Sequence, residues 1–273
     1  MKTQTVKKYL MVVLGLILGI SSYGQESGEW RIPLSNPGQK GILVVDLRSG
    51  SVNVTGGALS EVVVSYSLRE KKITGKDKNQ TSDGLNRIGG ASLDLEASEN
   101  NNTVKIESNS WSQGVDLNIQ VPKNFDLHLE TYNNGDLSAK NIIGEVEADN
   151  YNGKITLENI SGSVVADTYN GGIVVTFDQV KPDTPMAFST YNGNVDLTFP
   201  SDYRASFKMK TKMGEIFEGF DMKIEEAKPK TETKKESGVY KVKIDDWIRG
   251  SINGGGPEIS MKTTNGDIYV RKK

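Results

Sequence analysis

The sequence contains no cysteine and only one histidine, His128. Without cysteine the chain can form no disulfide framework and no thiolate zinc site, and no cysteine is present for lipid attachment. A Ser-His-Asp site would have to use His128, but no Gly-x-Ser-x-Gly elbow or His-Glu-x-x-His motif is present. Strand alternation around Leu127 and Leu129 points His128 outward. We therefore predict an exposed strand histidine and no enzyme.

An excess of basic residues is also missing, because 33 Lys and Arg oppose 35 Asp and Glu for a net charge of −2. Such a chain lacks the basic footprint that phosphate contacts require, which argues against nucleic-acid binding. Proline is scarce at 8 residues, whereas glycine is abundant at 29. This composition is typical of many short strands joined by tight turns.

The N-terminus has the pattern of a secretory signal. Lys2, Lys7 and Lys8 precede an apolar run at residues 10–20 and a small, polar stretch at 21–25. The run is too short to cross a bilayer core of about 30 Å as a helix, which disfavours the alternative of a retained anchor. We predict a signal peptide over residues 1–24, export to the periplasm or cell surface, and no stable membrane insertion after cleavage. Loss of three lysines and no acid would change the net charge from −2 to −5.

A Thr-Tyr-Asn-Gly phrase recurs through the second half of the chain. It occupies residues 131–135, 150–153, 168–171 and 190–193, with degenerate copies at 211–214 and 263–266. From Gly135 to Gly214 successive glycines of the phrase are 18, 18, 22 and 21 residues apart. So short a period fits one coil of a solenoid better than one globular unit. Asn-Gly is also a strong hairpin signal, so an antiparallel meander is the competing structural prediction.

Alternation within the repeat predicts a continuous core. Val146, Ala148, Ile155 and Leu157 point inward in one coil, and equivalent positions are apolar in the next coil, at Val164, Ala166, Ile173 and Val175. Stacking the coils would bury one core that no single coil could form. The predicted fold class is all-β, a right-handed parallel β-solenoid (β-helix) of short coils with polar insertions.

The flanks are predicted to continue this single domain, residues 25–273. Two polar or charge-rich insertions are expected, at about 71–102 and 223–237. After the second, the segment 239–244 is predicted to resume the coil. The lysine-rich segment ending at Lys273 is predicted to protect an open end of the solenoid.

The Thr-Tyr-Asn-Gly and Ser-Gly-Ser-Val repeats, with the Ser-Gly-Ser-Val-Asn-Val strand pair at 49–54, resemble the bacterial putative-adhesin family of β-strand-repeat domains of unknown function. The similarity covers roughly residues 41–270. The resemblance implies a β-helical fold, export and a cell-envelope adhesion role, and its motif is structural rather than catalytic.

Tyrosines at one repeat position form the candidate binding surface. Tyr132, Tyr151, Tyr169 and Tyr191 each follow an inward residue, so period two sends their rings outward. Stacked one strand apart, they would form a stripe suited to the apolar faces of sugars or to a protein partner. The same stripe could instead serve only to stabilise strand stacking.

Carboxylates at Glu130, Asp149 and Asp167 precede these tyrosines by two residues, and the same column continues through Ser189, Lys210 and Lys262. A Ca²⁺ ion bridging Asp149 and Asp167 would suit hard oxygen ligands, although a solvated acidic strip is favoured. No other cofactor is expected. The predicted function is an exported, non-enzymatic binding or adhesion-like module for an unknown glycan or envelope protein. The alternatives are a polysaccharide-acting β-helix enzyme and an envelope scaffold or sensor.

Overall fold

The computed structural model of the protein describes residues 27–69, 94–181, 183–225, 231–236, 239–244 and 246–273. All regular structure in these residues is β-strand, which confirms the all-β prediction. No helix in the described part of the chain has the length and apolar character needed to cross a membrane. The predicted signal peptide lies outside the described residues.

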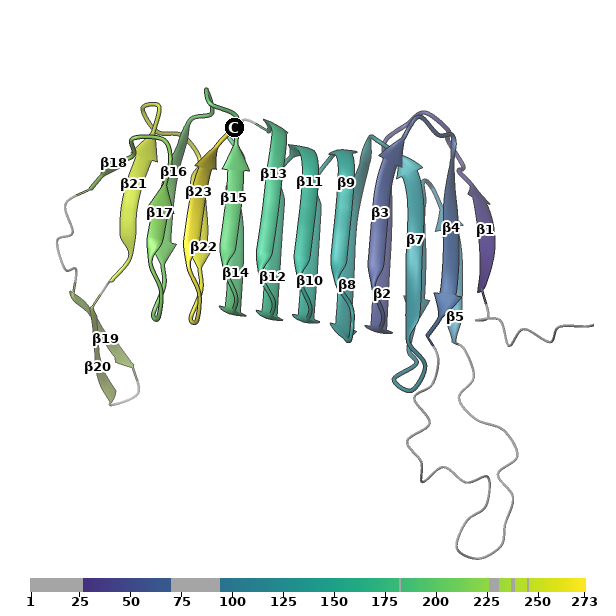
Figure 1. Cartoon of the computed structure of the whole chain (residues 1–273), viewed down its shortest axis with the longest axis horizontal. Coiled ribbons are helices and arrows are strands. Elements are labelled where there is room, and N and C mark those ends of the chain that lie inside the picture. The colour runs from purple at the N-terminus through teal and green to yellow at the C-terminus, as the bar shows by residue number, and fades with distance from the viewer. Residues whose placement is uncertain (1–26, 70–93, 182, 226–230, 237–238, 245) are drawn as a thin grey trace, which may run out of the picture.

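Two large sheets lie along the long axis of the molecule (Figure 1). The ten-stranded sheet, called sheet A, has the spatial order β1 (Ser27–Pro33), β4 (Glu61–Leu68), β7 (Val115–Pro122), β3 (Val52–Gly57), β9 (Leu137–Ile143), β11 (Ile155–Gly162), β13 (Ile173–Val180), β15 (Val195–Phe199), β23 (Ile268–Lys272) and β17 (Ile216–Glu218).

The eleven-stranded sheet, called sheet B, has the order β18 (Lys223–Ile224), β21 (Ile248–Ile252), β16 (Ala205–Lys210), β22 (Glu258–Lys262), β14 (Met186–Asn192), β12 (Val164–Asn170), β10 (Val146–Asn152), β8 (Phe125–Asn133), β2 (Gly41–Ser49), β6 (Thr103–Ser108) and β5 (Leu95–Asn100). A separate two-stranded sheet pairs β19 (Thr231–Glu236) with β20 (Val239–Ile244).

From β8 to β15 successive strands alternate between the sheets, and each pairs in parallel with its counterparts one step along the repeat. The predicted inward register is confirmed. Ile155 lies beside Ile173, Val146 beside Val164, and all the predicted inward positions of these two coils are at most 2% exposed. One hydrophobic core runs between the sheets from Leu34 to Val270.

The spatial order of the strands departs from chain order at both ends. β22 and β23 insert between the β14–β15 and β16–β17 strands, so the segment ending at Lys273 is covered by β17 rather than open. The prediction of an open end there was wrong. After β18 the chain forms β21, which pairs antiparallel with β18 and β16. Only then does it form β22 and β23, which pair in parallel with the strands on both sides of them.

Antiparallel pairs at the ends make the two sheets mixed rather than uniformly parallel, namely β1 with β4, β4 with β7, β5 with β6, and β21 with β16 and β18. Within the first predicted insertion, Leu95–Asn100 forms β5 and belongs to sheet B. The prediction that residues 239–244 resume the coil was also wrong, because β20 pairs only with β19 among the described strands.

Candidate binding face

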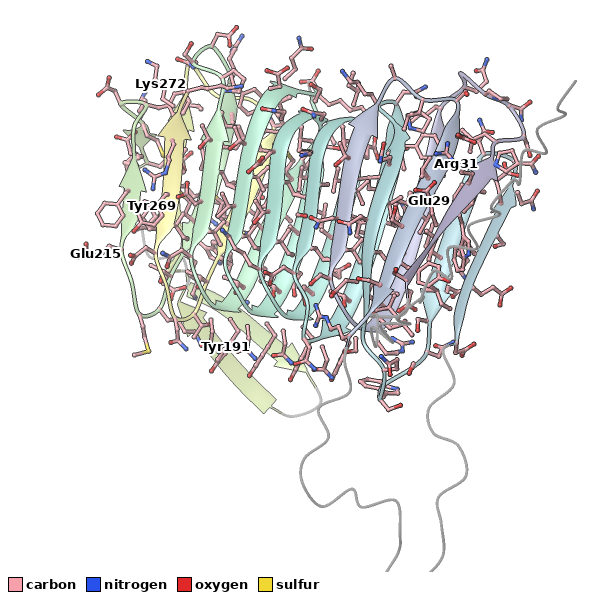
Figure 2. The ribbon with its side chains drawn as sticks, turned by 45° about the vertical axis from the view of Figure 1, so that its right-hand side comes forward. Glu29, Arg31, Tyr191, Glu215, Tyr269 and Lys272 are labelled. Carbon is pink, nitrogen blue, oxygen red and sulfur yellow. The ribbon has the colours of Figure 1, made fainter. Side chains whose placement is uncertain are left out.

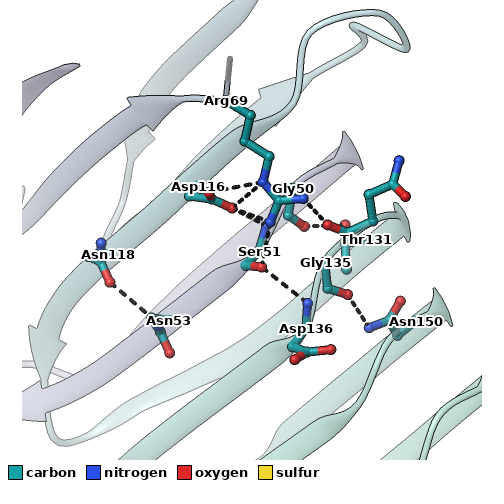
Figure 3. Close-up of polar contacts among 11 residues, drawn as sticks. Gly50, Ser51, Asn53, Arg69, Asp116, Asn118, Thr131, Gly135, Asp136 and Asn150 are labelled. Carbon is teal, nitrogen blue, oxygen red and sulfur yellow. Dashed lines mark hydrogen bonds and ion pairs between the residues drawn. The ribbon is translucent and has the colours of Figure 1, made fainter. Parts of the chain in front are cut away.

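The first residue of each Thr-Tyr-Asn-Gly phrase points inward and donates a hydrogen bond to the glycine carbonyl of a neighbouring repeat. Thr131 Oγ1 donates to Gly50 O at 2.9 Å, and Asn150 Nδ2 donates to Gly135 O at 2.9 Å (Figure 3). Thr168, Thr190 and Thr263 repeat this bond with the glycine of the adjacent repeat. Each of these buried side chains therefore donates a hydrogen bond that ties its corner to the neighbouring one, although Asn150 Oδ1 itself accepts none.

Close approach of neighbouring corners explains why the phrase ends in glycine. A Cβ atom at Gly153 would overlap the carbonyl oxygen of Gly135, and one at Gly171 would overlap the carbonyl oxygen of Gly153. Neither glycine is among the residues with positive φ. The requirement for glycine at these two positions is therefore space for a neighbouring backbone.

The four candidate tyrosines stack into one ladder, called here the tyrosine ladder. Ring centroids are 4.7, 5.1 and 4.9 Å apart from Tyr132 through Tyr151 and Tyr169 to Tyr191, and successive planes differ by at most 8°. The spacing follows from the parallel strand separation of about 4.8 Å. The side chains are exposed, at 37–44%, and Tyr191 lies at the lower edge of the molecule in Figure 2.

Stacking determines which parts of these rings a partner can reach. The faces of Tyr151 and Tyr169 are covered by their neighbours on both sides. Trp111 contacts Tyr132 edge-on at 5.2 Å and extends the stripe at its N-terminal end. Beyond Tyr191 the repeat position is held by Thr264, so among the described residues no aromatic ring stacks on the second face of Tyr191. The stripe therefore presents mainly ring edges and hydroxyl groups.

An asparagine ladder runs beside the tyrosines, one residue further along each strand. Asn152 Nδ2 donates to Asn133 Oδ1 at 2.9 Å, and Asn170, Asn192 and Asn265 each donate to the preceding side chain at 2.6–2.7 Å. Each of the inner amides uses one N–H group and its carbonyl oxygen within the ladder. They hold neighbouring corners in register, and with the stacked rings they act against the twist that sheets normally adopt.

Five acidic residues form a row across adjacent strands of sheet B, at the strand position two residues before the tyrosines of the repeat. This carboxylate row consists of Glu107, Asp46, Glu130, Asp149 and Asp167. The column continues through Ser189, Lys262 and Lys210. Glu107 and Asp46 were not predicted, because β6 and β2 carry no copy of the Thr-Tyr-Asn-Gly phrase and only strand pairing brings them into line.

Charge is partly compensated at the N-terminal end of the row. Lys105 Nζ lies 2.7 Å from Glu107 Oε1, and Arg48 Nη1 lies 3.4 Å from Asp46 Oδ1. Glu130, Asp149 and Asp167 have no ion pair in the part of the chain that the structure describes. Partial burial, followed by repulsion from Glu147, Asp167 and Glu130, raises the pKa of Asp149 to about 6.

Asp149→Asn is expected to raise the melting temperature at pH 7.5 and to have progressively less effect toward pH 4. The pKa of Asp149 is about 6 in the folded protein and about 3.8 in the unfolded chain. The contribution of Asp149 to the free energy of unfolding is therefore fully present below pH 3.8, where the residue is protonated in both states, and is lost as the pH rises through 6. Thermal melts across this range test the sign. Glu158→Gln on β11 of sheet A is the control, and an Asp149→Asn effect that stays constant with pH would contradict the assignment.

Most of the candidate site lies within the part of the chain that a family model matches. The sequence model of the Toastrack family, DUF4097, matches residues 131–271. The chain belongs to the Toastrack family. The match begins at Thr131, the first residue of the first complete phrase, and ends in β23. The predicted membership in an adhesin-like family of unknown function is thereby confirmed.

Two solved structures resemble this Toastrack chain. One is a putative cell adhesion protein from Clostridium sporogenes ATCC 15579, with 10% identity, a TM-score of 0.45, and coverage of 92% of this chain and 100% of that chain. The other is a putative adhesin from Bacteroides fragilis NCTC 9343, with 8% identity, a TM-score of 0.41, and coverage of 92% and 98%. A comparison with curated proteins finds no match.

All the predicted binding and metal residues except Tyr191 meet in a shallow hollow of about 380 Å³. It is lined by Glu130, Asp149 and Asp167 together with Tyr132, Tyr151 and Tyr169. In the described residues, acidic side chains and histidine form no group of three or more that could hold a metal ion. The hollow is a mixed aromatic and acidic surface.

His128 is exposed on β8, as predicted, with Nδ1 3.7 Å from Glu147 Oε2. A larger cleft, of about 700 Å³, lies elsewhere and includes Asp183, Tyr203 and Arg204. Burial, with the charge of Asp183, raises the pKa of Tyr203 to about 12. The Tyr203 hydroxyl therefore keeps its proton at neutral pH.

Proposed function

We propose that this Toastrack protein is an exported, non-enzymatic, adhesion-like module that binds an envelope partner through the tyrosine ladder and the carboxylate row. We further propose that its alternating parallel strands are the coils of a right-handed β-solenoid, which serves as a rigid support for this face. Export is supported by the charged, apolar and small-residue pattern at the N-terminus.

The exposed tyrosine stack carries this proposal. The ladder and Trp111 place five aromatic side chains in one line on the surface. Aromatic residues are enriched in binding interfaces, because they bury a large area at little cost in conformational entropy. The four tyrosine hydroxyls have no hydrogen-bond partner within the described residues, so they remain available to a partner.

A protein partner fits this surface better than a sugar. Sugars bind aromatic side chains through the ring face, but the faces of Tyr151 and Tyr169 are covered by neighbouring rings. Ring edges, hydroxyl groups and three uncompensated carboxylates instead suit hydrogen-bond donors and cationic side chains of a protein.

Tyr151→Ala/Tyr169→Ala is expected to reduce binding to envelope proteins at least tenfold, because truncated aromatic hot spots commonly cost about 2 kcal/mol or more. The folded state should persist, since each lost stacking contact is worth only about 0.5–1.5 kcal/mol. Binding is measured by biolayer interferometry with solubilised envelope fractions and, in parallel, with a glycan array.

Phe217→Ala supplies the matched control, because Phe217 is an exposed ring stacked on Tyr269 in sheet A, away from the tyrosine ladder. This variant should bind like the wild type. A double tyrosine variant that folds and retains full binding would assign the ladder to stability alone. Binding to glycans that depends on Tyr191 rather than on Tyr151 would favour a sugar partner, stacked on the face of Tyr191 that no aromatic ring covers.

A further inference from the structure

The outer face of sheet B carries opposite charges on its two halves. Toward β5, the charged outward side chains are mostly acidic: the carboxylate row together with Glu147 and Glu96, with Lys105 and Arg48 paired to its end. Toward β18, the charged outward side chains are mostly basic, at Lys262, Lys208, Lys210, Arg249 and Lys223, and serines and the acidic Glu258 lie between them. The division falls between β12 and β14, near the middle of the sheet.

The charges nearest this division are not neutralised by any ion pair among the residues that the structure describes. Lys262 is exposed and has no ion pair among the described residues, and the same holds for Asp149 and Asp167. Two strand intervals, about 9.6 Å, separate Lys262 from Asp167, with the uncharged Ser189 between them. Lys210, further out, forms an ion pair with Asp246.

We propose that the partner of this face is a second copy of the same chain, docked face to face with its strand order reversed. This inference rests on the proposed function and names its partner. A two-fold axis parallel to the strands, above the space between β12 and β14, places the acidic half of one copy over the basic half of the other. It sets β10 against β22 of the second copy and β8 against β16 of the second copy.

Residue pairs under this symmetry are complementary along the central column. Asp149 meets Lys262 of the second copy, Glu130 meets Lys210 of the second copy, and Asp167 meets the Ser189 hydroxyl. Every pair occurs twice because a two-fold interface is isologous. In the same arrangement Tyr169 lies against Tyr191 of the second copy, and the exposed Val165 lies against Ala187 of the second copy.

Shape and size also fit a second copy. The strands of the central region run side by side with little twist in Figure 1, so two such faces can approach over their whole length. Eight strands at about 4.8 Å and three outward positions at about 6.8 Å cover roughly 38 by 20 Å, or about 750 Å². That is close to the 800 Å² or so that each partner contributes to a standard interface. A purely cationic partner would leave the basic half of the face uncovered.

A charge swap tests the pairing. In sedimentation-velocity experiments the wild-type protein should dimerise at about 50 mM salt and dissociate toward 1 M salt, where the Debye length is about 3 Å. Asp149→Lys and Lys262→Glu should each weaken the dimer at least tenfold, since both place like charges together. The combined Asp149→Lys/Lys262→Glu variant should restore dimerisation to within about threefold of the wild type.

Lys140→Glu on β9 is the matched control, because it makes the same charge change as Lys262→Glu but on the outer face of sheet A. It should leave dimerisation unchanged. A wild-type protein that stays monomeric at millimolar concentration, or a double variant that remains as weak as the single ones, would overturn the second-copy partner. Envelope binding that still depends on Tyr151 and Tyr169 in such a monomer would leave the proposed function standing.

Discussion

Ile155→Asp is expected to leave the protein unfolded at 25 °C. Ile155 is fully buried, between Leu137 on β9 and Ile173 on β13. An aspartate there would lose its hydration without gaining a partner, which costs several kcal/mol as an ionised or a protonated group. Such a cost is comparable with the whole free energy of unfolding of a typical domain, about 5–15 kcal/mol. Far-ultraviolet circular dichroism and thermal melting measure the loss.

Thr156→Asp provides the comparison, because Thr156 is the next residue on β11 and points to the opposite side of sheet A. This variant should fold, and its melting temperature should remain within a few degrees of the wild type. Equal melting of Ile155→Asp and Thr156→Asp would contradict the inward register that underlies both the core and the surface ladders.

Gly171→Ala is expected to lower the melting temperature strongly, whereas Gly172→Ala should have little effect. A Cβ at Gly171 would overlap the carbonyl oxygen of Gly153, but at Gly172 the nearest atom, Asn194 O, is 3.3 Å away. Neither residue has positive φ, so the comparison isolates the close approach of two corners. Overpacking of this kind costs about 1–3 kcal/mol, and each kcal/mol lowers the melting temperature of a chain this long by roughly 2–4 °C.

Gly171→Ala carries a second expectation for the surface. Displacing the corner at Gly171 should disturb the amide bond from Asn170 to Asn152 and the stacking of Tyr169 on Tyr151. Binding should therefore fall together with stability in this variant, but not in Gly172→Ala. If both glycine variants melted alike, close packing of the corners would not be the reason for glycine in the repeat.

Much of the central region is predictable from the sequence, because each residue of the Thr-Tyr-Asn-Gly phrase meets the same environment in every coil. Period two and the constant spacing identify inward positions such as Ile155 and Val164, outward rings such as Tyr151, and the exposure of His128. The carboxylates at Glu130, Asp149 and Asp167 were placed in one column by the same reasoning.

Strand order at the ends could not be predicted, since sequence spacing does not record a chain reversal. β22 pairs with β14 and β16 although some 50 or more residues separate it from each. This long-range pairing places Lys262 before Lys210 in the charged column. In the same way, the pairing of β2 with both β6 and β8 extends the carboxylate row by Asp46 and Glu107.

The sequence by itself determined the all-β class, the family, the buried face of each repeated strand and the alignment of the four tyrosines, because these follow from local alternation and a short period. Only the tertiary structure decided that the tyrosine faces are covered, that glycine makes room for a neighbouring carbonyl, and that acidic and basic halves divide one face. Those properties depend on the distances and order of strands that are remote in sequence, and interstrand pairing alone establishes them.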